Sequence, residues 1–132
     1  MALSGMPLLL LIDDEPAQKR FVSALAARAG WRTIYASDQS AALATLGTRD
    51  GMQLDAVLID HWNPGMKPVE TIREIRARRP SLPILVITSQ NDVLDAVEAM
   101  RAGATDYLAK PIAPDRFLAA DEEDIKRKAV WY

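Results

Sequence analysis

Acidic side chains follow the first and third apolar runs of the chain, where they could hold a metal ion. Asp13 and Asp14 come directly after the run Leu8–Ile12, and Asp60 follows the run Ala56–Ile59. Carboxylates held close together repel one another, and a bound divalent cation removes that repulsion. Oxygen ligands without a cysteine or histidine cluster favour Mg²⁺, with Mn²⁺ as a substitute. A carboxylate beside such a metal can also act as a nucleophile toward phosphorus.

Two further polar side chains follow the fourth and fifth apolar runs. Thr88 comes after the run Ile84–Ile87, and Lys110 comes after the run Tyr107–Ala109. We expect the hydroxyl and the ammonium to contact phosphoryl oxygens, because such groups share the charge that develops during phosphoryl transfer. The first acidic turn contains no glycine, which disfavours the backbone phosphate cradle of nucleotide-binding loops.

Short apolar runs alternate with stretches of helical periodicity along the whole chain. The runs predict strands over residues 8–12, roughly 33–36, 56–59, 84–87 and 107–109. Continuous runs of Val, Ile and Leu are typical of strands buried on both faces of a parallel sheet. The stretches between and after them predict five helices, which carry the apolar residues Phe21, Leu25 and Ala29; Leu43 and Leu46; Val69, Ile72 and Ile75; Val93, Val97 and Met100; and Phe117, Leu118 and Ile125. The alternation predicts an α/β fold whose site residues meet at the carboxyl edge of the sheet.

Length and composition narrow the class of protein. The 132 residues suit one domain, and 16 basic against 18 acidic residues argue against a dedicated nucleic-acid-binding domain. The absence of cysteine fits a reducing compartment, and we expect a cytoplasmic location. The longest aliphatic run has five residues, too few to span a bilayer.

Four motifs, taken together and in order, resemble the receiver domain of two-component response regulators. They are Ile12-Asp13-Asp14-Glu15-Pro16; Leu58-Ile59-Asp60 with Pro64-Gly65-Met66; Ile87-Thr88-Ser89; and the run from Ala102 to Lys110-Pro111. The resemblance covers roughly residues 7–120 and implies a flavodoxin-like (βα)5 fold. It implies a doubly wound parallel five-stranded sheet of order 2-1-3-4-5. We expect a single receiver domain over residues 1–132, with 121–132 forming either the end of the last helix or the start of a linker to an output module.

The resemblance implies a role for each carboxylate. It makes Asp60 the phosphoacceptor, which takes a phosphoryl group from a sensor histidine kinase or a phosphotransfer protein. It implies that Mg²⁺ is held by Asp13, Asp14 and Asp60 and by the backbone carbonyl of Trp62. The domain is then expected not to be an enzyme, apart from slow self-dephosphorylation.

The resemblance also implies a switch. Thr88 and Tyr107 match the family's switch pair, and Lys110 matches the lysine that pairs with the phosphoryl group. Phosphorylation would change a surface formed by the fourth helix, fifth strand and fifth helix, which could bind a partner or form a homodimer. We expect a transcriptional output, with no direct contact of this domain with nucleic acid or membrane. Without the resemblance, Tyr107 would be interpreted as a packed core residue.

Two alternative functions remain open from the sequence. The family usually has Met and Asp-Gly where this chain has Asn63 and Lys67-Pro68, which would suit a phosphorylation-independent pseudo-receiver scaffold. A metal-dependent phosphohydrolase is disfavoured, because Trp62 stands where a second catalytic carboxylate would be needed.

Several residues are expected to have structural roles only. Met100 is predicted to lie in the core, and either Ser37 or Asp38 is predicted to cap the second helix. A solvated helix face, rather than a phosphate-binding patch, is predicted for Arg73, Arg76, Arg78 and Arg79.

Overall fold

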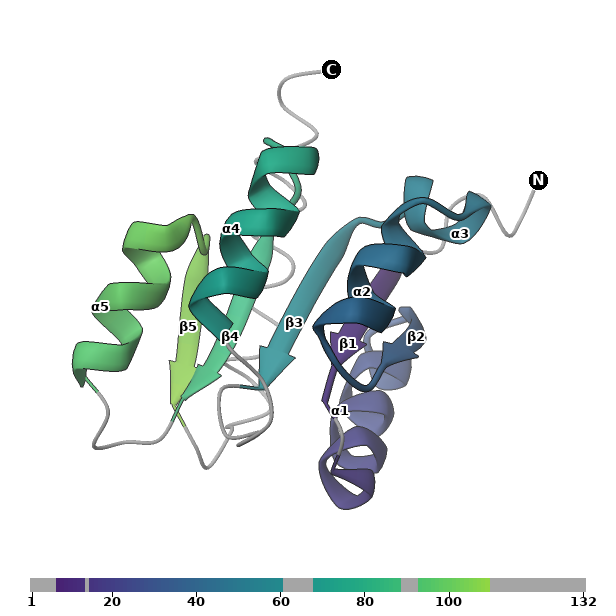
Figure 1. Ribbon diagram of the computed structural model, residues 1–132. Coiled ribbons are helices and arrows are strands. Elements are labelled where there is room, and N and C mark those ends of the chain that lie inside the picture. Colours follow the sequence, from purple (N-terminus) through teal and green to yellow (C-terminus); the bar gives the residue numbers. More distant parts are fainter. Residues whose placement is uncertain (1–6, 14, 61–67, 89–92, 110–132) are drawn as a thin grey trace.

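A parallel five-stranded sheet forms the centre of the molecule (Figure 1). The computed structural model describes residues 7–13, 15–60, 68–88 and 93–109. The strands are β1 (Leu8–Ile12), β2 (Arg32–Ala36), β3 (Ala56–Asp60), β4 (Ile84–Thr88) and β5 (Asp106–Ala109). Their order is β2-β1-β3-β4-β5, and every neighbouring pair is parallel. The fold class is therefore confirmed, and each predicted strand agrees with the observed one to within one residue at either end.

Helices cover both faces of the sheet. They are α1 (Pro16–Arg28), α2 (Gln39–Leu46), α3 (Arg49–Met52), α4 (Pro68–Arg78) and α5 (Val93–Ala102). Buried residues of α2, α4 and α5 share one core cluster, and those of α1 belong to the other. Figure 1 shows the same division, with α1 behind the sheet and α2, α4 and α5 in front. The predicted helix that starts near Pro114 lies outside the described residues.

The central strand β1 explains why its sequence is continuously apolar. Leu8, Leu10 and Ile12 belong to the core cluster that includes residues of α2, α4 and α5, whereas Leu9 and Leu11 belong to the cluster that includes residues of α1. All five side chains are buried, as expected for a parallel strand covered on both faces. Full burial of each leucine contributes roughly 1.5–3 kcal/mol. This burial fixes β1, and with it the position of the acidic turn that follows.

Local sequence signals set the helix ends. The side chain of Asp38 caps α2, because its Oδ1 accepts a hydrogen bond of 2.8 Å from the backbone N–H of Ala41. This decides between the two predicted caps. Gly30 and Gly103 follow α1 and α5 with φ of 86° and 121°, a backbone region that favours glycine. Pro68 is the first residue of α4, a position that tolerates proline because the helix needs no N–H donor there.

The prediction that Met100 lies in the core is wrong. Met100 is 40% exposed and Val97 is 41% exposed, whereas Ala96 and Ala99 are buried. The side of α5 that carries Ala96 and Ala99 faces the sheet, so Val97 and Met100 are left outside. Phe21 of α1 is similarly exposed, and the buried side of that helix carries smaller aliphatic residues instead.

The predicted solvated arginine face is correct for Arg73 and Arg78, which are exposed. It is correct only in part for Arg76 and Arg79, which are half-buried and donate hydrogen bonds to the backbone of other segments. The guanidinium of Arg76 donates to Gly103 O through Nε at 3.0 Å and through Nη2 at 2.7 Å. It thereby joins α4 to the turn between α5 and β5. Burial lowers the pKa of this guanidinium from its ordinary value because the charged form is desolvated.

Candidate functional site

Asp13 and Asp60 stand at the carboxyl ends of neighbouring strands. Ile12 of β1 pairs with Ile59 of β3, so Asp13 and Asp60 each come one residue after the same pair. The backbone N–H of Asp13 donates to Ala36 O at 3.0 Å, which also ties this position to the end of β2. The register therefore brings together two of the three predicted carboxylates.

Both carboxylates are buried. Asp13 is 1% exposed and Asp60 is 2% exposed, and they are the only buried charged side chains in the described part of the chain. Asp13 Oδ1 accepts a hydrogen bond of 2.9 Å from the backbone N–H of Glu15, and both aspartates take part in interactions within the protein. Two buried like charges on adjacent strands are costly unless they are compensated. Such a donor set is suited to a hard divalent cation, which prefers oxygen ligands.

The other predicted residues follow the strands on the far side of β3. Asp60 pairs with Ile87, which places Thr88 one residue further along β4. Thr88 pairs with Ala109 at the end of β5, and Lys110 comes next in the chain. The backbone of Thr88 therefore lies at the same edge of the sheet as Asp13 and Asp60.

Parts of the predicted site lie outside the described residues. This applies to Asp14, Trp62 and Lys110, and the side chain of Thr88 is not described either. Within residues 7–13, 15–60, 68–88 and 93–109, no three His, Cys, Asp or Glu side chains are grouped as metal ligands. The proposed metal site therefore depends on Asp14 and Trp62 in addition to the two buried aspartates.

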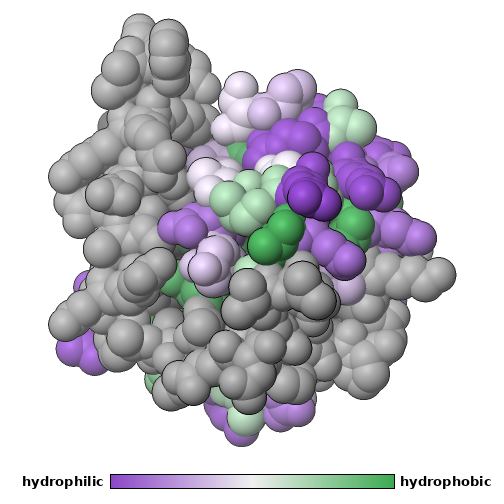
Figure 2. Space-filling view, turned by 90° about the vertical axis from the view of Figure 1, so that its left-hand side faces the viewer, coloured by the Kyte–Doolittle hydropathy of each residue, from purple (hydrophilic) through white to green (hydrophobic). Residues whose placement is uncertain are grey.

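Tyr107 is an exposed residue of β5. Its side chain is 40% exposed, so the interpretation of Tyr107 as a core residue is not correct. It belongs to the end of the sheet that α5 covers, where Val97 and Met100 are also exposed. Figure 2 shows this side of the molecule, with apolar groups among hydrophilic ones.

No helix among the described residues is long and apolar enough to cross a membrane.

Sequence comparison finds relatives of the chain among bacterial transcriptional regulators. It is 34% identical over 117 residues to the transcriptional regulatory protein FixJ of Bradyrhizobium diazoefficiens, covering 89% of this chain and 56% of FixJ. It is 36% identical over 108 residues to the transcriptional regulatory protein ZraR of Salmonella typhimurium, covering 82% of this chain and 24% of ZraR. The chain thus spans about half or less of the length of these curated relatives.

Solved structures agree with the sequence comparison. A response regulator receiver domain protein from Clostridium thermocellum superposes with a TM-score of 0.87 at 27% identity, covering 96% of this chain and all of that one. The receiver domain of the sensor histidine kinase PA1611 from Pseudomonas aeruginosa, solved with a magnesium ion coordinated in its active site cleft, gives 0.79 at 26% identity. That match covers 92% of this chain and 99% of the PA1611 domain.

The family model described as the response regulator receiver domain matches residues 9–121. This range includes every predicted site residue and all five strands except Leu8, the first residue of β1. The relatives named above are transcriptional regulators. The chain belongs to the response regulator receiver domain family of two-component systems.

Proposed function

We propose that Asp60 is a phosphoacceptor that takes a phosphoryl group from a histidine kinase or a phosphotransfer protein in the cytoplasm. The observation that carries this proposal is the burial of Asp60 beside the Asp13 position at the carboxyl edge of the sheet. A carboxylate oxygen of Asp60 attacks the phosphorus atom of the partner's phosphohistidine. A P–O bond forms, the P–N bond breaks, and its electron pair returns to the imidazole nitrogen, giving an acyl phosphate on Asp60.

The proposal includes a Mg²⁺ ion held by Asp13, Asp14, Asp60 and the backbone carbonyl of Trp62, with Mn²⁺ as a substitute. The two buried carboxylates supply oxygen donors of the type that Mg²⁺ prefers. When bound, the ion offsets the negative charge of the carboxylates and of the phosphoryl oxygens. Asp13 keeps its carboxylate in place through the Glu15 N–H bond, and Asp60 provides the attacking oxygen.

Switching is proposed to follow from the new charge on Asp60. The phosphoryl oxygens attract the Thr88 hydroxyl and the Lys110 ammonium, and Tyr107 then moves inward. Tyr107 is 40% exposed, which is compatible with such an inward movement. The altered surface of α5, β5 and the last helix would bind a partner or a second copy of the chain and control a transcriptional output. We place the core of the domain at about residues 7–120, followed by the end of the last helix or a linker.

Phosphorylation by a small-molecule donor tests the proposal. The chain is incubated with Mg²⁺ and acetyl phosphate, and its intact mass is measured. We expect the parent to gain the mass of one phosphoryl group and Asp60→Asn to gain none. Asp50→Asn is the control and should gain one group like the parent, because Asp50 is an exposed carboxylate of α3, away from the carboxyl edge of the sheet. Chelation of the metal should also prevent the gain.

The same experiment distinguishes a pseudo-receiver scaffold. Such a scaffold would show no Asp60-dependent gain of mass under any of these conditions. Its sequence support comes from Asn63 and Lys67-Pro68, but Pro68 is accommodated as the first residue of α4. The proline is therefore compatible with an ordinary helix start, which reduces the support for the scaffold.

A further inference from the structure

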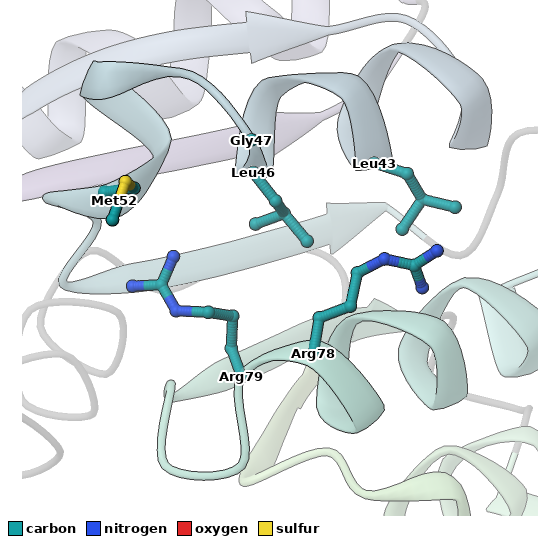
Figure 3. A pocket seen from close by; sticks show the side chains of 6 residues that line it. All are labelled: Leu43, Leu46, Gly47, Met52, Arg78 and Arg79. Atoms are coloured by element: carbon teal, nitrogen blue, oxygen red, sulfur yellow. The ribbon is translucent and has the colours of Figure 1, made fainter.

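A hollow between α2, α3 and α4 is separate from the carboxyl edge of the sheet, which carries Asp13 and Asp60. Its volume is about 450 Å³, within the range of roughly 300–1,000 Å³ that is common for ligand pockets. Figure 3 shows its lining residues, which are Leu43, Leu46, Gly47, Met52, Arg78 and Arg79. These residues lie in α3 or in, or directly after, the C-terminal parts of α2 and α4, so the hollow lies toward the amino ends of the strands. Asp60, the proposed phosphoacceptor, lies at the opposite, carboxyl ends of the strands.

The walls of the hollow are held in place by contacts between the three helices. A Cβ atom at Gly51 would lie 1.8 Å from Thr45 O, so α3 packs directly against the end of α2. Arg79 Nη1 donates to Gly51 O at 2.7 Å, which ties α3 to the end of α4. At the other end of these helices, Thr71 Oγ1 donates to Gln39 Oε1 at 3.2 Å. The space between α2 and α4 is therefore fixed before any ligand binds.

The hollow combines an apolar wall with cationic groups. Leu43 and Met52 extend from the α2–α3 side, and Arg78 and Arg79 extend from α4 toward them (Figure 3). Met52 is 73% exposed. Arg78 Nη1 donates hydrogen bonds to the carboxylate and the backbone carbonyl of Glu74. Arg79 Nη1 donates to Gly51 O. In the described ranges, Nε and Nη2 of both guanidinium groups are left as donors for a ligand.

We propose that this hollow binds a segment of a partner protein in which an apolar side chain stands next to one or more carboxylates. The apolar side chain would fill the space lined by Leu43, Leu46 and Met52, and a carboxylate would accept paired hydrogen bonds from a guanidinium. Within the described residues Arg79 has no acidic partner, so its charge is complementary to an acidic segment. The exposed Met52 favours a protein segment over a small molecule, because methionine adapts to partner surfaces and this side chain would remain uncovered by a small ligand.

Selection from a displayed library of random twelve-residue peptides tests the proposal with the whole chain as the target. Selected clones are assayed against Met52→Asp and Arg78→Gln, which change exposed side chains and should leave the fold intact. Phe21→Asp is the matched control, because it changes an exposed apolar side chain of α1, on the other face of the sheet. We expect clones that bind the parent and the control equally and lose about tenfold or more in affinity on Met52→Asp and Arg78→Gln. These clones should carry an apolar residue beside Asp or Glu.

Three results would overturn the proposal. One is a selection that yields no clone sensitive to Met52→Asp. Another is a set of sensitive clones that lack acidic residues. The third is tighter binding of decanoate than of the selected peptides, measured from the methyl NMR signals of Leu43 and Met52, which would assign the hollow to a small amphipathic anion. Asp60→Asn should not alter peptide binding, so this test is independent of the phosphoacceptor proposal.

Discussion

Replacing Arg76 with methionine removes one guanidinium that joins three segments of the chain while keeping an unbranched apolar side chain. The lost hydrogen bonds run to Gly103 O at 3.0 and 2.7 Å, to Leu82 O at 2.6 Å, to Pro80 O at 3.0 Å, to Arg79 O at 3.2 Å and to Thr105 Oγ1 at 3.4 Å. These acceptors belong to the turn before β5 and to the loop before β4. The substitution therefore disconnects both from the end of α4.

The expected loss follows from the number of carbonyl groups that lose their charged donor. A hydrogen bond to a charged group contributes roughly 1.5–3 kcal/mol, and a typical neutral one contributes about 1 kcal/mol. Water can replace the donor at Pro80 O, where the bond is exposed, but less well at the partly buried Leu82 O and Gly103 O. Removing the half-buried charge also recovers part of the desolvation cost, which is the cause of the lowered pKa of Arg76. We expect the free energy of unfolding to fall by roughly 2–4 kcal/mol.

Urea unfolding followed by circular dichroism measures this loss. Arg78→Met is the matched control, because Arg78 lies two positions further along α4 and forms an exposed pair with Glu74. An exposed pair of this spacing contributes about 0.3–0.5 kcal/mol. The reasoning is refuted if Arg76→Met lowers the free energy of unfolding by less than about 1 kcal/mol, or by no more than Arg78→Met does.

Three further changes have sharply different expected effects. Gly51→Ala would place a Cβ 1.8 Å from Thr45 O and should cost roughly 1–3 kcal/mol, whereas Gly47→Ala meets only ordinary contacts and should be close to neutral; thermal unfolding compares the two. Equal effects of the two substitutions would contradict the close packing of α3 on α2. Asp38→Ala removes the cap of α2 and should cost about 1 kcal/mol in urea unfolding, and an unchanged midpoint would argue against this cap. Asp13→Asn should weaken Mg²⁺ binding roughly tenfold or more, which is a loss of about 1.4 kcal/mol or more of binding free energy and can be measured by calorimetry. It should leave the metal-free protein at least as stable as the parent, because one of two buried like charges is removed; unchanged Mg²⁺ affinity would exclude Asp13 as a ligand.

Much of the architecture could be predicted because it depends on local patterns. The continuous apolar run of β1 indicates a strand covered on both faces, and Asp38 stands where a helix cap is expected. Placing Asp13 and Asp60 together required only the rule that parallel strands end at one edge, and the register confirms that placement. The roles of these two residues in phosphoryl transfer stay a prediction.

Other features depend on contacts between segments that are distant in the sequence. Arg76 has the same sequence neighbours as an ordinary solvated arginine, and only the approach of Leu82 and Gly103 makes it a half-buried donor. Met100 follows the apolar period of its helix, but the alanines on the other side pack closer to the sheet. Helix α3 has four residues and contains Gly51, so neither its length nor its composition indicates a helix. The hollow beside it could not be predicted for the same reason.

The most direct test of the central claim is to identify which residue carries the phosphoryl group. The chain is phosphorylated with Mg²⁺ and acetyl phosphate and then reduced with borohydride, which converts an aspartyl phosphate to homoserine. Peptide mass spectrometry then locates the converted residue. We predict homoserine at position 60 alone, with none formed when Mg²⁺ is chelated. Conversion at Asp13 or at an exposed carboxylate, with position 60 unchanged, would contradict the account.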